Sequence, residues 1–353
     1  MAKAIDAFCG SGGLTLGLDR AGFSVIAGFD LDPVCIQTLK HNSKYISHPV
    51  FQSDVRDLLG GNLLEIVGIR PGELDLLAGG PPCQGFSVQR TIGSDSDARN
   101  LLVHDYGDLI QEVLPKFFLI ENVPGIGGSR GRDVLAAFVI RMQKSDYIIH
   151  QAILDAQEFD VPQRRRRYII VGERIDNDGE PRFKWPTPSK CRRVTVRQTI
   201  GRLPAPPLDG SEHPKLPNHR ADKLSALNRE RIAALLPGQG RTDLPDHLLA
   251  DCHKLGADVI GHRNVYGRMA WDEVAPTITA RFDSFTRGKF GHPDQPRTIS
   301  LREGARLQTF PDDFVFCGNK VEVARQIGNA VPTKLAEALG TAILQALDRN
   351  SRH

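Results

Sequence analysis

The feature of this sequence that most constrains its fold is the alternation of short β-rich runs with amphipathic helical stretches from the N-terminus to Gly172. Helical periodicity is clear at Pro33–Asn42 and His104–Lys116. Strands that alternate with helices of this length are joined by crossover connections, which predicts an α/β fold with a mostly parallel sheet and helices on both faces. Because about a dozen residues without a clear helix join the last two strands, we expect these to form an antiparallel hairpin at the sheet edge. The predicted strands are Ala4–Phe8, Val25–Phe29, Val50–Gln52, Leu74–Ala78, Phe117–Glu121, Ile148–Leu154 and Tyr168–Val171.

The composition changes after Gly172, where a stretch rich in Pro, Arg, His and Asp runs to about Pro296. Helical periodicity is weak there apart from Asp222–Leu236, so we expect a smaller, irregular second domain over residues 173–296. Near the C-terminus an apolar helix face returns, and such a face needs a core. We therefore expect residues 297–353 to complete the first domain, residues 1–172. The face consists of Leu335, Leu339, Ile343 and Leu347.

Composition excludes several classes of protein. No run of 18 or more apolar residues is present, and the start of the chain is not apolar enough for a signal peptide. The six cysteines occur singly, without a CxxC pair, so neither a zinc site nor a disulfide framework is predicted. The net charge of +3 does not identify a nucleic-acid binder, but four arginines gather in Gln163–Tyr168. We expect a soluble, intracellular protein.

A glycine-rich turn follows the first predicted strand in the segment "IDAFCGSGGLTLGL". Gly10, Gly12 and Gly13 permit a tight turn into a helix whose first amides can face a ligand. Asp30 ends the second strand, about 20 residues after Gly10, where a carboxylate can accept both hydroxyls of a ribose. Asp54 follows the third strand, near the expected position of an adenine amino group. The pattern predicts a cofactor that contains adenosine, and by itself it does not distinguish NAD from S-adenosylmethionine.

The fourth strand runs into two glycines and two prolines, which end it directly before Cys83. A structural cysteine belongs in the interior of a strand or helix, whereas a thiol presented rigidly at the cofactor crevice suits a covalent nucleophile. Glu121 closes the apolar strand "FFLIE" at the same edge of the sheet. An acid in this position is better explained by chemistry than by surface exposure.

Six segments in this order closely resemble the DNA (cytosine-5)-methyltransferases: "DAFCGSGGLTLGL", "GGPPCQGFS", "ENV", "QRRRR", "LREGARLQTFPD" and "QIGNAVP". The resemblance covers nearly the whole chain except about Glu173 to Arg268. Amino-directed DNA methyltransferases are similar only in the cofactor loop and carry an aromatic residue in place of Cys83. The resemblance implies a Rossmann-like, S-adenosylmethionine-dependent methyltransferase fold with a target-recognition domain. It also implies methyl transfer to carbon 5 of a cytosine flipped out of duplex DNA, with S-adenosylhomocysteine as product.

The resemblance also implies catalytic roles. Cys83 would add to carbon 6 of the cytosine and make carbon 5 nucleophilic. Glu121 would protonate or hydrogen-bond N3 and the exocyclic amine, while Arg165 and Arg167 would hold the O2 atom and neighbouring groups. The other arginines of the run would be solvated, because alternate strand residues face opposite sides. The base that removes the proton from carbon 5 is not identified.

For the cofactor, Phe8 would pack on S-adenosylmethionine, Leu31 would cover one face of the adenine and Val55 would flank it. Asp30 stands where the family more often has glutamate, and its shorter arm still reaches a ribose. Asn329 would complete the pocket, although a helix-start turn before Pro332 is an alternative explanation. The residues expected to bind the cofactor are Phe8, Gly10, Gly12, Leu14, Asp30, Leu31, Asp54, Val55, Pro81 and Asn329.

For the DNA, the stretch from Gln84 to Arg99 would form a lid over the flipped nucleotide. The segment "PTITAR" resembles the end of the family's recognition domain, and the variable stretch would read base edges and phosphates. The residues expected to contact DNA are Ser87, Gln89, Gln163, Thr277 and Thr279.

Alternative functions remain at this point. A tRNA cytosine-5 methyltransferase shares the chemistry, but its eukaryotic members carry Cys-Phe-Thr, whereas Cys191 is followed here by Arg-Arg and Cys252 by His-Lys. A catalytically silent DNA-binding relative would not need the intact Cys83 and Glu121, and a nicotinamide dehydrogenase leaves Pro-Pro-Cys unexplained. We expect a cytoplasmic, nucleoid-associated bacterial enzyme of the restriction–modification or orphan type. It would be a monomer acting on double-stranded DNA, without metal or membrane, with any cognate restriction endonuclease encoded alongside but not bound.

Overall fold

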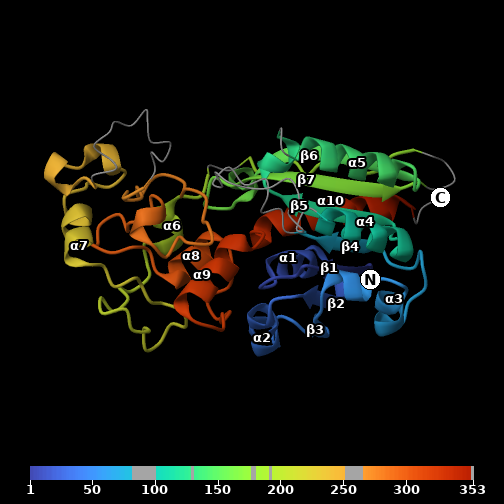
Figure 1. Ribbon diagram of the computed structural model, residues 1–353, viewed down its shortest axis with the longest axis horizontal. Helices are drawn as coiled ribbons and strands as arrows, with labels where there is room; N and C mark the ends of the chain where they lie inside the picture. The colour runs from blue at the N-terminus through green and yellow to red at the C-terminus, as the bar shows by residue number, and fades with distance from the viewer. Residues whose placement is uncertain (82–100, 129–130, 176–179, 191–192, 251–264, 351–353) are drawn as a thin grey trace. The chain divides into compact units, whose positions relative to one another are not determined.

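The computed structural model describes residues 1–81, 101–128, 131–175, 180–190, 193–250 and 265–350, which form two compact units (Figure 1). Unit 1 comprises Met1–Phe159, Arg166–Ser189 and Val331–His353, and unit 2 comprises Asp160–Arg165 and Lys190–Ala330. Residues 297–330, which the sequence grouped with the first domain, lie in unit 2. The physical reason is hydrogen bonding: the amides of Leu301 and Arg302 donate to carbonyls of the segment 218–220 in the same unit.

Unit 1 is built on a seven-stranded sheet with the order β3-β2-β1-β4-β5-β7-β6 (Figure 1). The pairs β1–β2, β2–β3, β1–β4 and β4–β5 are parallel, whereas β7 is antiparallel to both β5 and β6. The prediction of a mostly parallel sheet that ends in an antiparallel hairpin is therefore confirmed. The strands are β1 Lys3–Ala7, β2 Ser24–Asp30, β3 Val50–Gln52, β4 Leu76–Gly79, β5 Phe117–Asn122, β6 Tyr147–Asp155 and β7 Arg166–Arg174.

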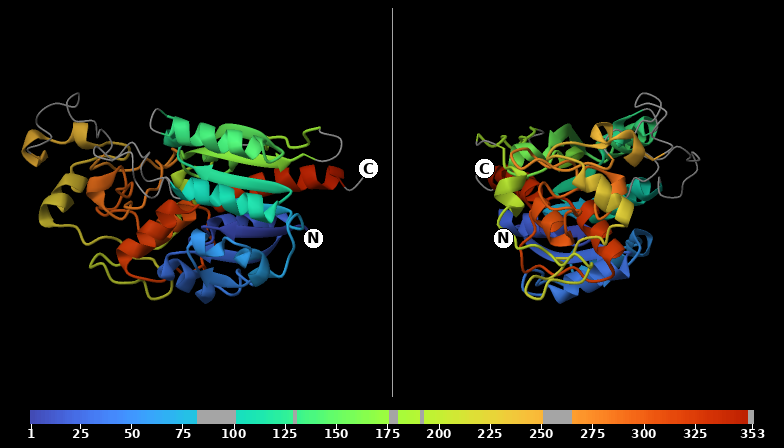
Figure 2. Two further views of the ribbon diagram at one scale, coloured as in Figure 1. Left: turned by 45° about the vertical axis from the view of Figure 1, so that its right-hand side comes forward. Right: turned by 90° about the vertical axis from the view of Figure 1, so that its left-hand side faces the viewer.

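Helices cover both faces of this sheet. Successive side chains of β1 point to opposite faces, so Ile5 and Ala7 join a core that includes Phe138 of α5. Asp6, between them, meets Thr15 of α1 on the other face. Helix α1 packs along α10, and Figure 2 shows α4 and α10 on opposite sides of the sheet. The helices are α1 Gly13–Ala21, α2 Pro33–His41, α3 Asn62–Val67, α4 Leu101–Val113, α5 Arg132–Gln143 and α10 Thr333–Asn350.

Local sequence explains where these helices begin and what they bury. Helix α2 starts where the Asp32 side chain accepts a hydrogen bond from the Val34 amide, with Pro33 at the first helical position. In α10, the four apolar residues predicted to share one face are all buried. Among the described residues, no helix combines the length and apolar character that crossing a bilayer requires.

Unit 2 has short elements joined by long irregular segments, as its Pro-rich composition predicts. Helix α7 is shorter than the predicted Asp222–Leu236 because Ser225 caps it, accepting a hydrogen bond from the Asn228 amide. The helices are α6 Val196–Ile200, α7 Ala226–Ala233, α8 Leu301–Leu307 and α9 Lys320–Asn329.

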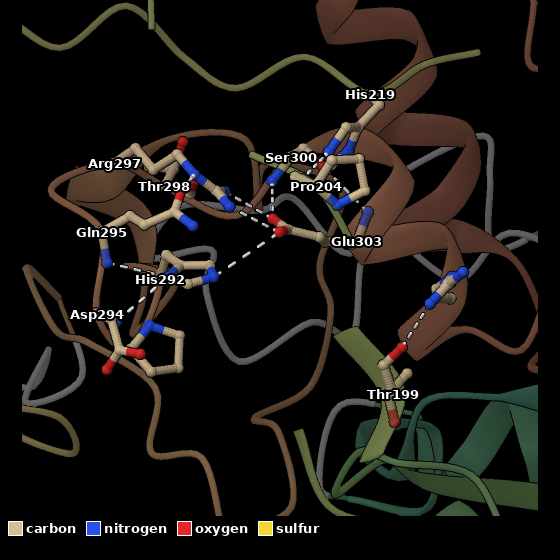
Figure 3. A network of polar contacts seen from close by, with 12 residues as sticks. Thr199, Pro204, His219, His292, Asp294, Gln295, Arg297, Thr298, Ser300 and Glu303 are labelled. Atoms are coloured by element: carbon tan, nitrogen blue, oxygen red, sulfur yellow. Dashed lines mark hydrogen bonds and ion pairs between the residues drawn. The ribbon is translucent and has the colours of Figure 1, made fainter. Parts of the chain in front are cut away.

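A buried polar network anchors the start of α8 in unit 2 (Figure 3). The Arg297 guanidinium donates to both carboxylate oxygens of Glu303, at 2.7 and 2.8 Å, and the Ser300 amide donates to Oε2. Burial alone would raise the pKa of Glu303, but the hydrogen bonds and charge of Arg297 hold it below its ordinary value. Burial and the Arg297 charge lower the pKa of His292 to about 4, so this ring is neutral near pH 7 and accepts two backbone N–H bonds at Nδ1. The network fixes the loop before α8.

Candidate active site

The glycine turn after β1 takes the backbone conformation that the sequence predicts for a ligand-binding loop. Gly10 and Gly12 have φ values of 51° and 86°, in the left-handed region that favours glycine. Phe8 also has a positive φ, 64°, and its ring packs edge-on against Tyr106 with centroids 5.7 Å apart. A non-glycine residue in this region is uncommon and is often found at a functional site.

Asp30 ties the end of β2 to the glycine turn. Its carboxylate accepts hydrogen bonds from the Gly10 and Asp32 amides, each at 2.8 Å. A Cβ atom built on Gly10 would meet no atom within 4 Å, and the neighbouring Leu31 is 61% exposed although it is apolar. These features fit a cofactor that contains adenosine. The Asp30 carboxylate suits the ribose, the open turn at Gly10 suits the amino-acid end, and the uncovered Leu31 side chain suits the adenine.

Asp54 and Val55 lie where β3 passes into a short 3₁₀ helix, Val55–Leu58. The Asp54 carboxylate accepts the amide of Arg56 and pairs with its guanidinium at 2.6 Å. These hydrogen bonds lower the pKa of Asp54, so the group is a carboxylate acceptor at neutral pH. Val55 belongs to the buried core, as does Leu14 of α1.

The ends of β4 and β5 meet at the same edge of the sheet. The Asn122 side chain donates from Nδ2 to the carbonyl of Pro81 at 3.0 Å. A Cβ atom built on Gly80 would lie 3.8 Å from Oε2 of Glu121, so the chain at Gly80 runs directly beside this acid. Glu121 and Asn122 are 8% and 5% exposed, which makes this edge a largely desolvated polar site.

Arg167 supplies the charge opposite Glu121. Its Nε atom lies 2.7 Å from Oε1 of Glu121, an ion pair by distance in which the N–H is not aligned as a good hydrogen bond. Arg167 Nη1 donates to the Arg166 carbonyl. Both partners of the ion pair are about 90% covered by protein, which strengthens the interaction relative to a surface pair. A buried carboxylate held beside a guanidinium suits recognition of a polar ring.

The arginine run alternates in exposure as expected for an extended segment. Arg165 and Arg167 are buried, whereas Arg164 and Arg166 are exposed. The run also crosses from unit 2 to unit 1 between Arg165 and Arg166.

In unit 2, the side chains of Gln163 and Arg165 are 0% and 1% exposed, and both form hydrogen bonds to other residues of the same chain. Arg165 donates from Nη1 to the carbonyls of Ile278 and Gly328, and from Nη2 to those of Gly328 and Ala330. Gln163 accepts the Ile278 amide at Oε1 and donates from Nε2 to the Leu307 carbonyl.

The other predicted residues of unit 2 lie on the segments that this network holds. Thr277 and Thr279 are partly exposed on either side of the buried Ile278, and the Thr277 hydroxyl donates to the Arg164 carbonyl. Asn329 is exposed at the end of α9.

Comparison with known proteins decides the family. The model of the C-5 cytosine-specific DNA methylases matches residues 2–345. The chain belongs to this family. Among similar proteins, the Type II methylase M.HgiDII of Herpetosiphon aurantiacus is 35% identical, over 98% of this chain and 95% of that protein. The Type II methyltransferase M1.HphI of Haemophilus parahaemolyticus is 34% identical, over 97% of this chain and 86% of that protein.

Solved structures agree with the fold of this methylase. A DNA modification methyltransferase encoded within an Escherichia coli prophage has a TM-score of 0.75 at 26% identity, covering 99% of this chain and 100% of that one. Spodoptera frugiperda DNMT2 has a TM-score of 0.60 at 17% identity, covering 98% of this chain and 100% of that one, which shows the fold alone.

Three residues predicted for the methylase site, Cys83, Ser87 and Gln89, lie outside the described residues. Among the residues that are described, no group of three or more His, Cys, Asp or Glu side chains is arranged to hold a metal ion.

Asp6 is a buried acid beside the site that the sequence patterns did not single out. This residue is fully buried, accepts a hydrogen bond from the Thr15 hydroxyl at 2.6 Å, and keeps Oδ1 without a hydrogen-bond partner among the described residues. Burial raises the pKa of Asp6 to about 7, the Thr15 hydrogen bond opposes this, and the negative charge of Asp30 adds to it. The available signal was an acid inside the apolar strand "AIDA", directly before the glycine turn.

Proposed function

We propose that this methylase transfers a methyl group from S-adenosylmethionine to carbon 5 of a flipped-out cytosine in duplex DNA, through a bond between Cys83 and carbon 6. The observation that carries the proposal is the buried pair of Glu121 and Arg167 beside the end of β4. Asn122 anchors Pro81 there, and Cys83 follows Pro81 by two positions in the sequence. The family assignment supports the reaction type.

The protein's part in the chemistry follows from these groups. A free thiol is mostly protonated at neutral pH, so the site must favour the thiolate of Cys83. Its sulfur bonds to carbon 6, the electrons of the C5–C6 double bond move into the ring, and N3 receives a proton that Glu121 takes up from solvent when the cytosine enters and passes on to it. Carbon 5 then forms its bond to the methyl group. Loss of the carbon 5 proton to a base restores the double bond and expels Cys83 as thiolate, and N3 returns its proton to Glu121.

When bound, S-adenosylmethionine supplies an electrophilic methyl group and leaves as S-adenosylhomocysteine. Phe8, the Gly10–Gly12 turn, Asp30 and Leu31 fit the cofactor by the geometry described above. Leu14, Asp54, Val55, Pro81 and Asn329 are proposed to contribute on the strength of the resemblance. Arg167 would orient the base through its O2 atom while holding Glu121 in place.

On the DNA side, Thr277 and Thr279 are proposed to contact the backbone of the flipped strand, and Ser87 and Gln89 the flipped nucleotide. The resemblance also assigns Gln163 to DNA and Arg165 to the base, and the hydrogen bonds of both favour the different role argued below. The Type II relatives support a role in restriction–modification. We further propose that the enzyme acts as a monomer at the nucleoid, with any cognate endonuclease encoded alongside but not bound.

The test is methyl transfer from tritiated S-adenosylmethionine to duplex DNA, with bisulfite sequencing to locate the product. We expect Cys83→Ala to abolish transfer and to retain DNA binding, because the thiol is needed only for the covalent step. Cys317→Ala is the matched control, since Cys317 is a partly buried cysteine of unit 2 that is not in a disulfide. An oligonucleotide with 5-fluorocytosine should trap a covalent adduct with the wild-type protein and none with Cys83→Ala. Turnover by Cys83→Ala, or labelling of tRNA alone, would refute the proposal.

A further inference from the structure

We propose that Arg165 is a positioning residue that fixes the segment Thr277–Thr279 against the turn Gly328–Ala330, and that it does not bind the cytosine. The inference rests on the proposed function and assigns a new task to one arginine of the predicted site. Each group involved lies in unit 2.

The four terminal N–H donors of Arg165 are already committed. Each terminal nitrogen of a guanidinium carries two N–H groups. Nη1 donates to the carbonyls of Ile278 at 2.9 Å and Gly328 at 3.1 Å, and Nη2 donates to those of Gly328 at 3.1 Å and Ala330 at 2.9 Å. The four terminal N–H groups are thus matched by four acceptor contacts, and the residue is only 1% exposed. Binding a cytosine O2 through a terminal nitrogen would require one of these buried hydrogen bonds to break, and the Nε–H is buried as well.

The segment before Arg165 is joined to the Thr277–Thr279 region by the main chain as well. Gln163 and Ala275 form a parallel bridge, in which the Arg164 amide donates to the Ala275 carbonyl and the Ala275 amide donates to Pro162. The Ile278 amide then donates to Oε1 of Gln163 at 3.0 Å. Because side chains alternate along an extended segment, burying Ile278 turns its two threonine neighbours outward.

The second side of the network is the turn at the end of α9. A Cβ atom built on Gly328 would lie 2.2 Å from the carbonyl carbon and oxygen of Thr279, so only glycine allows this approach of the two backbones. Gln308 donates from Nε2 to the carbonyls of Ile327 and Ala330, and its Oε1 accepts from Gln163. Ala330 is therefore held by Gln308 and by Arg165.

These contacts predict a specific kinetic effect. Loss of the Arg165 network should displace the threonines that face DNA and leave the reacting groups unchanged. With Arg165→Lys we expect KM for duplex DNA to rise about tenfold, equivalent to about 1.4 kcal/mol of binding free energy, while kcat stays within about twofold. Lysine offers only one nitrogen, so it cannot reproduce the whole network, but it keeps the charge and some N–H donors. KM should therefore rise less with Arg165→Lys than with Arg165→Met, which has no donor.

Arg167→Lys is the matched control from the same arginine run. It perturbs the ion pair with Glu121, so we expect kcat to fall by about 100-fold, the loss typical for a donor that acts on the reacting group. A second readout is the salt dependence of DNA affinity. The buried guanidinium neutralises no phosphate, so Arg165→Lys and Arg165→Met should both leave the slope of log K against log salt unchanged.

If the Arg165 variants do not fold, two further variants test whether this network positions the Thr277–Thr279 segment. Gly328→Ala and Gln308→Met keep Arg165 but disturb the same juxtaposition, and both should raise KM for DNA without lowering kcat. The proposal is overturned if Arg165→Lys lowers kcat as Arg167→Lys does, if Arg165→Met reduces the salt slope, or if both Gly328→Ala and Gln308→Met leave KM unchanged. Failure of the proposed function is distinct, because the wild-type chain would then not methylate duplex DNA.

Discussion

Asp6→Asn should change how the stability of this methylase depends on pH. Asp6 is fully buried below the glycine turn, with one oxygen bonded to Thr15 and the other unsatisfied within the described chain. Among the described residues, the ionisable groups that interact with Asp6 are Asp30, Cys9 and Tyr106. Burial raises the pKa of both Cys9 and Tyr106 well above the ordinary values, so these two stay neutral in the range of interest.

The sign and size of the effect follow from proton linkage. An unfolded aspartate has a pKa of about 3.9, and the folded value for Asp6 is about 7. Between these values the folded state holds a proton that the unfolded state has released, so the free energy of unfolding falls as pH rises. The slope is about 1.4 kcal/mol per pH unit and decreases near pH 7, where Asp6 is half ionised, so the loss from pH 5 to pH 7 is about 2.3 kcal/mol, with about 0.4 kcal/mol more at higher pH. For a domain of this size the loss to pH 7 corresponds to about 5–9 °C in Tm.

The assay is thermal unfolding by circular dichroism from pH 5 to pH 8. Because Asp6→Asn carries no titrating proton and its side-chain oxygen can still accept from Thr15, the variant should gain stability relative to wild type as pH rises. Asp57→Asn removes a carboxylate at an exposed position of the same unit and serves as the control. If the difference between wild type and Asp6→Asn stayed constant across this range, the linkage argument would be wrong.

Two further changes test packing and charge burial. Glu303→Gln should lower the free energy of unfolding by about 3–5 kcal/mol, because it leaves the buried Arg297 without its counter-charge. Asp272→Asn removes a charge from an exposed ion pair and should change the free energy of unfolding by less than about 1 kcal/mol. Equal effects of the two variants in urea unfolding would contradict this reasoning. Gly17→Ala should lower the free energy of unfolding by about 1–3 kcal/mol, because the added Cβ would lie 2.3 Å from the Cβ of Ala336, where α1 packs on α10. A rise in Tm would show that the better helix propensity of alanine outweighs this clash.

The strands of this methylase could be predicted from sequence because a buried strand leaves a local pattern. All seven predicted strands are present, and Val50–Gln52 has the predicted bounds. The positions of Asp30 and Glu121 followed from the rule that parallel strands bring their carboxyl ends to one edge. These inferences need only the order of strands and the residue that ends each one.

The roles of Asp6 and Arg165 could not be predicted because their surroundings come from distant parts of the chain. The environment of Asp6 depends on α1 packing over the sheet. Arg165 donates to main-chain carbonyls of Ile278, Gly328 and Ala330. Every residue has such a carbonyl, so the amino-acid sequence gives no sign of which ones bind the guanidinium. The return to unit 1 at Val331 instead of near residue 297 likewise depends on hydrogen bonds between segments far apart in sequence.

Each acceptor described for Arg165 is a main-chain carbonyl, and that group is present whichever amino acid carries it. Residues at positions 278 and 330 can therefore be exchanged for others of similar size without depriving the guanidinium of a partner, provided that Gly328 is kept. The hydrogen bonds of Arg165 therefore depend little on which side chains this segment carries. Partly exposed side chains such as Thr277 and Thr279 could therefore change while the framework that holds their backbone stays the same.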